Sequence, residues 1–218
     1  MLMLDDAPTQ VWMPASTVFV DSLADVTAIY TEGVTLCVLN RSLPPSVARF
    51  ARDTLLSRDL QLVVPVVTAR PELPEFLPGL AAAPGYEAFR ADICDMIGWY
   101  GELFAADEVG LRLYSTGADM CQNFHIDRVG VRLVCTYAGP GTEWLVEADV
   151  DRTALGQAYG DPETVMRDGA TIHRLTPGAV GLFKGEAWPG NAGHGLVHRS
   201  PAIAGRGERR VLITLDAL

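Results

Sequence analysis

The residues most suited to binding a metal ion are a histidine and an aspartate two positions apart, His125 and Asp127 in the segment FHID. In a β-strand, side chains at positions i and i+2 leave from the same face, so both could reach one ion. His198 in LVHRSP has strand-like neighbours and is the best third ligand. Two histidines and one carboxylate leave coordination positions open and suit Fe(II), although the same set binds other divalent metals.

This ligand set has rivals. His194 lies in the glycine-rich segment GNAGHG, where a loop would place a ligand imprecisely, so His198 is preferred. Glu143 could also reach the metal, which would change the ligand count. Arg132 and Arg199 are candidates for binding an acidic substrate, although pairing at the surface is the more common role of such residues.

The elements that must position these residues differ between the two halves of the chain. Residues 1–107 mix helical spacing with buried strand-like runs. Pro65 lacks a backbone N–H to donate, so the run 60–67 is expected at a sheet edge. Residues 108–218 carry short strand-like runs separated by Gly, Pro, Asp and Asn, which is typical of an antiparallel sandwich or barrel. The expected helices are 21–30, 46–56 and 86–105, and the expected strands are 34–40, 60–67, 109–115, 120–127, 129–137, 142–148, 171–175, 179–185, 194–200 and 209–217.

These patterns predict a single α+β domain over residues 1–218, with the N-terminal helices packed outside a β-structure formed by 108–218. The polar segment 151–169 is expected to be a loop with a helical turn.

Composition narrows the class of protein. With 49% apolar and 20% charged residues, the chain can bury a core. The net charge of −10 argues against nucleic acid or an anionic membrane as partners and leaves a small molecule or a protein side chain as substrate. No apolar run reaches the roughly 18 residues of a membrane span, and MLMLDDAPTQ does not resemble a signal peptide. A cytoplasmic protein with four reduced cysteines is expected.

A family resemblance extends this interpretation. FHID–RVGVRLVCTY, PGAVGLFKG, GLVHRSP and GRGERRVLITL resemble the double-stranded β-helix (a jelly-roll or cupin-like barrel) of the Fe(II)/2-oxoglutarate-dependent oxygenases. The resemblance implies that His125, Asp127 and His198 bind iron and form the catalytic centre. It implies that Arg210 in RVLIT pairs with the distal carboxylate of 2-oxoglutarate, and that Asn123 and Tyr137 could hydrogen-bond this cosubstrate.

Strand alternation bears on two of these assignments. Arg210 would share a face with Leu212 and Thr214, which suits a ligand-lined interior, whereas Arg209 would share the face that packs on helices. A slip of one residue would exchange the two arginines. Tyr137 lies on an apolar strand face, so a core position stays open for it.

A closer resemblance is to the bacterial family called domain of unknown function 1826, carried by FHIDRVGVRLVCTYAGPGTEWL and LFKGEAWPGNAGHGLVHRSP. That family implies no activity. Three hypotheses follow: a hydroxylase-type Fe(II)/2-oxoglutarate oxygenase, a cupin-like Zn, Mn or Fe protein of metal homeostasis without oxygenase activity, and a scaffold barrel that has lost its metal.

Overall fold

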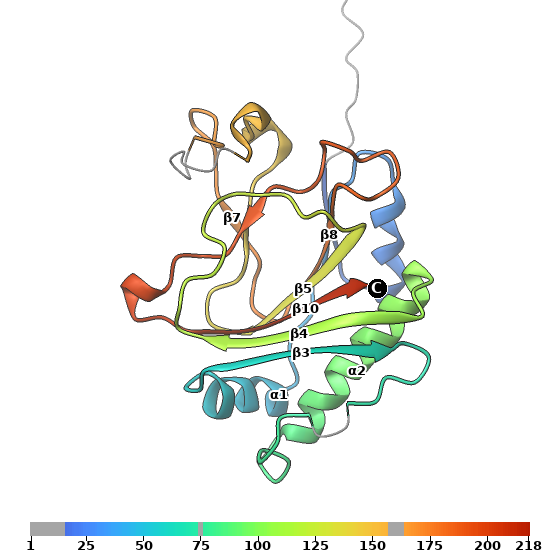
Figure 1. Cartoon of the computed structure of the whole chain (residues 1–218), viewed down its shortest axis with the longest axis vertical. Coiled ribbons are helices and arrows are strands. Elements are labelled where there is room, and N and C mark those ends of the chain that lie inside the picture. The colour runs from blue at the N-terminus through green and yellow to red at the C-terminus, as the bar shows by residue number, and fades with distance from the viewer. Residues whose placement is uncertain (1–15, 74–75, 157–163) are drawn as a thin grey trace, which may run out of the picture.

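A computed structural model describes residues 16–73, 76–156 and 164–218, and shows an α+β protein with one large, mainly antiparallel sheet (Figure 1). The segment MLMLDDAPTQ and some of the polar segment 151–169 lie outside the described residues. The large sheet has the order β1-β2-β8-β5-β10-β4-β3, and a small sheet has the order β7-β6-β9. The large sheet contains β1 (Thr17–Val20), β2 (Leu36–Leu39), β3 (Leu60–Val67), β4 (Glu108–Thr116), β5 (Val131–Ala138), β8 (Val180–Lys184) and β10 (Arg210–Ala217); the small one contains β6 (Glu143–Trp144), β7 (His173–Arg174) and β9 (His198–Arg199).

Two of the predicted helices are confirmed. α1 (Pro45–Arg49) begins with a proline in its first turn and continues as a π-helical turn over Phe50–Leu55. α2 (Tyr86–Phe104) buries apolar residues at three- and four-residue steps and ends where Ala105 turns left-handed at φ 49°. The predicted helix over 21–30 is instead a 3-10 helix, Leu23–Tyr30.

One face of the large sheet packs on these helices. Figure 1 shows α1 and α2 on the same side of β3, β4 and β10. Leu111, Leu133 and Ile213 from three adjacent strands join Phe89 and Ile97 of α2 in one buried cluster. The alternate residues of the same strands therefore face the opposite side, towards the small sheet.

The space between the two sheets is partly filled by a second apolar cluster. This cluster includes Val134 and Phe183 from the large sheet and Trp144 and Leu196 from the region of the small sheet. This cluster fixes the separation of the sheets and leaves the rest of the space to polar residues. β1, β2 and β3 come from the N-terminal half of the chain, so the large sheet draws strands from both halves.

The predicted strand over 120–127 is wrong. Within the described chain, this segment forms a single bridge, between His125 and His198. Its other backbone bonds are scattered: the carbonyl oxygen of Cys121 accepts from Ser200 after β9, and that of Asp127 accepts from Glu186 after β8. The strand over 60–67 is confirmed as β3 at a sheet edge, where Pro65 is tolerated. No helix in the described ranges combines the length and apolar composition needed to cross a bilayer.

Candidate metal centre

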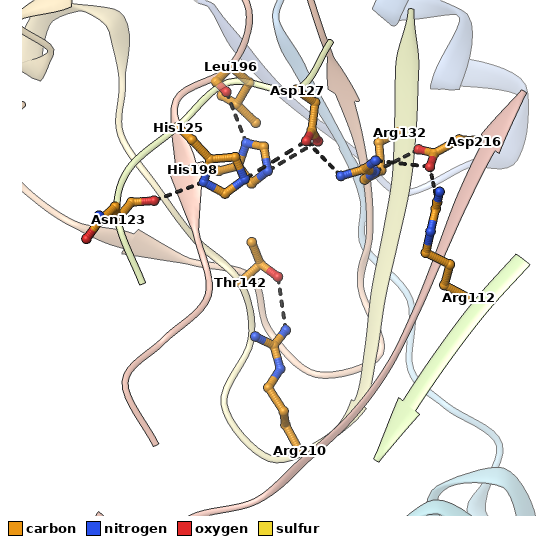
Figure 2. Close-up of polar contacts among 10 residues, drawn as sticks. All are labelled: Arg112, Asn123, His125, Asp127, Arg132, Thr142, Leu196, His198, Arg210 and Asp216. Carbon is orange, nitrogen blue, oxygen red and sulfur yellow. Dashed lines mark hydrogen bonds and ion pairs between the residues drawn. The ribbon is translucent and has the colours of Figure 1, made fainter. Parts of the chain in front are cut away.

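Three side chains converge at the mouth of the space between the sheets (Figure 2). One ligand atom each from His125, Asp127 and His198 lies within 4.8 Å of the others. The Nε2 of His198 is 3.3 Å from Asp127 Oδ2, and the Nε2 of His125 is 3.9 Å from Asp127 Oδ1. Two atoms bound to one divalent ion at about 2.1 Å each lie at most about 4.2 Å apart, so the distance from His198 Nε2 to Asp127 Oδ2 suits a shared ion.

The backbone positions the two histidines against each other. The N–H of His125 donates to the carbonyl of His198 at 3.0 Å, and the N–H of His198 donates to the carbonyl of His125 at 3.0 Å. The rings consequently lie 4.5 Å apart between centroids. Phe183 packs edge-on against the His198 ring at 4.9 Å, which fixes its orientation further.

Hydrogen bonds also fix which nitrogen faces the site. His125 Nδ1 lies 2.9 Å from the carbonyl oxygen of Asn123, and His198 Nδ1 lies 3.0 Å from that of Leu196. A carbonyl oxygen only accepts, so each Nδ1 carries a proton, and Nε2 is the ring nitrogen that faces the site. Histidines that bind metals are held in this way.

Asp127 is held by a chain of alternating charges. Arg132 Nη1 donates to Asp127 Oδ1 at 2.7 Å, and Arg132 Nε and Nη2 donate to the two oxygens of Asp216 at 2.7 and 3.0 Å. Asp216 also accepts from Nη1 of Arg112. Asp127 Oδ2 is buried and has no hydrogen-bond donor among the described residues. The chain of charges therefore occupies one oxygen of Asp127 and leaves the other for a cation.

The protonation equilibria fit this arrangement. Burial lowers the pKa of His125 and the adjacent His198 lowers it further, so the ring is neutral near pH 7. Burial raises the pKa of Asp127, but His198 and Arg132 more than offset it, and the pKa lies below its usual value. A neutral imidazole beside a carboxylate is the donor set that a divalent metal needs.

Arg210 lies at the inner end of the same region. Its side chain is fully buried, and Nη2 donates to the hydroxyls of Thr136 and Thr142 at 3.1 and 3.0 Å. Nε and Nη1 have no partner in the portion of the chain that the structure describes. Burial lowers the pKa of Arg210 to about 10, so the guanidinium keeps its charge at neutral pH. An unsatisfied buried guanidinium is costly and indicates a site for an anion.

A glycine turn sets Thr142 between Arg210 and the histidines, as Figure 2 shows. Gly139 has φ 80°, and a Cβ there would lie 2.0 Å from the carbonyl oxygen of Arg209. Only glycine allows the chain to pass β10 this closely on its way from β5 to Thr142. Thr142, His125 and His198 line one pocket of about 270 Å³.

Two residues expected at the site are not brought to it. Tyr137 is on the opposite face of β5 from Thr136, and its hydroxyl donates to Asp92 Oδ2 at 2.6 Å beneath α2. Asn123 is exposed and its side chain points away from the rings in Figure 2, while its backbone carbonyl holds His125. Strand alternation turns Tyr137 into the core under α2, and the bend before His125 leaves the Asn123 side chain exposed.

The structure also distinguishes between the alternative metal ligands and between the two neighbouring arginines. His194 lines a different cavity, and Glu143 is bound by Arg174 and Arg199 at 2.5 and 2.8 Å, so neither joins the three ligands. Arg210 faces the pocket side with Leu212 and Thr214, as expected. Arg209 faces the helix side, where it bonds backbone carbonyls of the 56–58 turn and Asp59.

Sequence reasoning missed the charge chain beyond Asp127. A signal was present, because Asp216 follows Arg210 at an even number of residues on one strand and so shares its face. The pairing of Asp216 with Arg132 across β10 and β5 depends on strand register, which the sequence does not reveal. Arg132, considered as a substrate ligand, is instead occupied by two carboxylates.

The chain was compared with protein families, with curated protein sequences and with solved structures. Residues 20–216 match a family model described as "Protein of unknown function (DUF1826)". No curated protein sequence matches the chain. Solved structures to which the chain is similar include a prolyl-4-hydroxylase of Pseudomonas putida at 14% identity and TM-score 0.44, covering 89% of this chain and 92% of that one.

Two further structures are comparable. The Arabidopsis thaliana dioxygenase for auxin oxidation, in a 2-oxoglutarate complex, is 12% identical with TM-score 0.45, covering 93% of this chain and 91% of that one. A full-length protein of Neurospora crassa, solved in complex with alpha-KG, is 10% identical with TM-score 0.46, covering 92% of this chain and 84% of that one.

Proposed function

Because the chain belongs to the DUF1826 family of proteins of unknown function, its activity has to be inferred from its own site, and we propose a non-haem Fe(II) oxygenase that uses 2-oxoglutarate. In this proposal the two sheets form a double-stranded β-helix around the site. The observation that carries it is the presence of two incomplete features beside one pocket, which His125, His198 and Thr142 line: a His, Asp, His set and a buried arginine with two nitrogens that make no hydrogen bond among the described residues.

The residues present fit a metal ion. His125 Nε2, His198 Nε2 and Asp127 Oδ2 each present a lone pair inward, and Asp127 Oδ2 lacks a donor within the described residues. Two imidazoles and a carboxylate on one side of an ion leave the opposite side open, which suits Fe(II). The same donors accept Zn or Mn, so the choice of iron rests on the rest of the pocket.

The residues also fit a dicarboxylate. Nε and Nη1 of Arg210 are unsatisfied among the described residues, and because they lie on different edges of the guanidinium, each can donate a charged hydrogen bond to a carboxylate oxygen. The Thr142 hydroxyl lies next to Arg210 on the way to the histidines and can donate to the same group. A short dicarboxylate held at one end by Arg210 would direct its other end to the metal ligands. We therefore assign Arg210 the distal carboxylate of 2-oxoglutarate.

Bound iron and 2-oxoglutarate would supply the oxidising chemistry, in which substrate R–H, dioxygen and 2-oxoglutarate become R–OH, succinate and carbon dioxide. The protein's own residues hold and orient the reactants. Arg132 fixes Asp127, the backbone carbonyls fix the tautomers of both histidines, and Phe183 excludes water from one side of His198.

An anaerobic titration tests the proposal. We expect the full-length chain loaded with Fe(II) to develop a weak visible charge-transfer band when 2-oxoglutarate is added, and Arg210→Met to require at least 10-fold more 2-oxoglutarate, since a lost charged hydrogen bond costs about 1.5–3 kcal/mol. The matched control is Arg209→Met, which removes the neighbouring arginine on the other strand face and should leave the titration unchanged. Tight metal binding without a band at saturating 2-oxoglutarate would contradict the proposal and favour a metal-binding protein without oxygenase activity.

A further inference from the structure

We propose that the substrate is a small organic anion whose carboxylate or phosphate group is held by Arg112 at the rim of the metal pocket. This inference rests on the proposed function, since it names the substrate of the same site. It depends on the charges of the pocket wall and on which guanidinium edges remain free.

The pocket wall is cationic although the chain is acidic. The net charge of the whole sequence is −10. The residues that line the pocket nevertheless include Arg112, Arg132 and Arg199 with the two histidines, and, in the described ranges, no aspartate or glutamate. Three carboxylates pair with these arginines, and all of them are buried and do not belong to the lining: Asp127, Asp216 and Glu143. A concave site lined by one sign of charge concentrates ligands of the opposite sign.

The three arginines differ in their free hydrogen-bond donors. Arg132 uses Nε and both terminal nitrogens on Asp127 and Asp216, so it has no free edge. Arg199 bonds Glu143 through Nε, and its guanidinium lies 4.2 Å from the centre of the Phe124 ring. Arg132 is therefore fully engaged, whereas Arg199 keeps Nη1 and Nη2 without a hydrogen bond among the described residues, but its side chain is only 16% exposed and lies against Phe124.

Arg112 is different. Only Nη1 is bonded, to Asp216, and Nε and Nη2 have no partner among residues 16–73, 76–156 and 164–218. Its side chain is 34% exposed, against 22% for Arg132. Nε and Nη2 form one edge of the guanidinium plane, and such an edge binds a carboxylate or phosphate through two hydrogen bonds.

The position of this edge separates it from the cosubstrate. Arg210 is fully buried at the inner end, whereas Arg112 is partly exposed, and Figure 2 shows Arg210 below Thr142 and Arg112 apart from it, beside Asp216. One dicarboxylate cosubstrate accounts for Arg210 and the metal, which leaves the Arg112 edge for a second anion. Asp216 and Arg132 already hold Arg112 in place, so little ordering entropy is lost on binding.

Isothermal calorimetry on the full-length chain, loaded with redox-inert Zn(II) and saturated with 2-oxoglutarate, tests this with three small probes. Butyrate and propyl phosphate carry the anion, and butyramide is the neutral match of butyrate. We expect at least one anion to bind about 10-fold or more tightly than butyramide. Arg112→Met should reduce that affinity to the level of butyramide, and Arg112→Lys should give an intermediate loss because it keeps the charge but not the fork. Arg206→Met, an exposed arginine in the 3-10 turn Ala204–Arg206, is the control.

Several results would overturn the inference. Equal affinity for butyrate, propyl phosphate and butyramide would exclude an anion site, and an unchanged Arg112→Met or Arg112→Lys variant would exclude this arginine. A larger loss of 2-oxoglutarate affinity in Arg112→Met than in Arg210→Met would make Arg112 a cosubstrate anchor instead. If 2-oxoglutarate fails to bind the wild-type chain, the proposed function fails separately, and the probe titrations are read on the zinc-loaded chain alone.

Discussion

The large sheet carries one buried carboxylate network on each face, and the two differ in completeness. Beneath α2, Asp92 accepts from Arg41 at 2.6 and 3.0 Å and from Tyr137 at 2.6 Å, so both of its oxygens are satisfied. On the pocket face, Asp127 Oδ2 and two nitrogens of Arg210 make no hydrogen bond within the described chain, and Oδ2 has only the Nε2 of His198 near it, at 3.3 Å. Folding alone therefore explains the first network, whereas the second needs ligands to complete it.

The strongest test of this contrast removes one metal ligand. We expect His125→Ala to weaken zinc binding at least about 100-fold, because one of three donors is lost, while the free energy of unfolding of the metal-free protein changes by less than about 1 kcal/mol. Chelator competition and urea unfolding measure the two effects. His194→Ala is the matched control, since that exposed histidine lies outside the three-ligand group. Equal zinc loss in both variants would contradict the assignment.

The opposite test removes Asp92 from the fully hydrogen-bonded network beneath α2. Asp92→Ala leaves Arg41 partly buried without its carboxylate, and we expect unfolding to become easier by about 3 kcal/mol. Zinc affinity of the folded fraction should stay within about twofold, because the change lies across the sheet. Asp95→Ala, an exposed residue of the same helix, should cost less than about 0.5 kcal/mol. Zinc loss in Asp92→Ala would mean that the two faces are coupled.

A smaller effect on zinc affinity is expected from Arg132, which holds the metal ligand Asp127 in place. Arg132→Met releases Asp127 Oδ1, and we expect zinc affinity to fall about 10- to 100-fold with the three ligands intact. The visible spectrum of the Co(II)-loaded protein should also change, since a freed carboxylate can bind through both oxygens. Arg128→Met, an exposed neighbour, provides the comparison. An unchanged spectrum with lower stability would give Arg132 a structural role only.

The smallest effect concerns pH. The pKa of His125 is lowered by folding, so the unfolded chain binds more protons and stability rises with pH across that range. The urea midpoint of the metal-free protein should thus decline from about pH 7 to about pH 5. The decline should be shallower in His125→Gln, which cannot titrate. Parallel curves for the two proteins would show that folding does not perturb this histidine.

Local patterns in the sequence were sufficient for several elements. α2 and β3 follow from helical periodicity and from a β-branched run, and the face of Arg210 follows from alternation along β10. His125 and Asp127 were identified as ligands through a strand that does not exist there. They converge because the segment is extended and pinned at one bridge to His198, which reproduces the effect of a strand locally.

The remaining features depend on which strands and helices pair across long distances in the sequence. Tyr137 and Thr136 are adjacent in sequence, but which of them faces the pocket depends on the side that α2 covers. The partners of Arg132 depend on the register between β5 and β10, and the short β6, β7 and β9 depend on the packing of the two sheets. Such features are set by tertiary structure and have no local signature.

The place of β10 in the large sheet has a consequence for biosynthesis. β10 lies between β4 and β5, although residues 108–138 precede it by a long stretch of chain. Until residues 210–217 have been translated, β4 and β5 each present an open edge to water or to a chaperone. Arg210 enters with the same strand, so a nascent chain can acquire neither the closed sheet nor the inner anion grip early. The large sheet and the anion site can therefore form only after residues 210–217 have been translated.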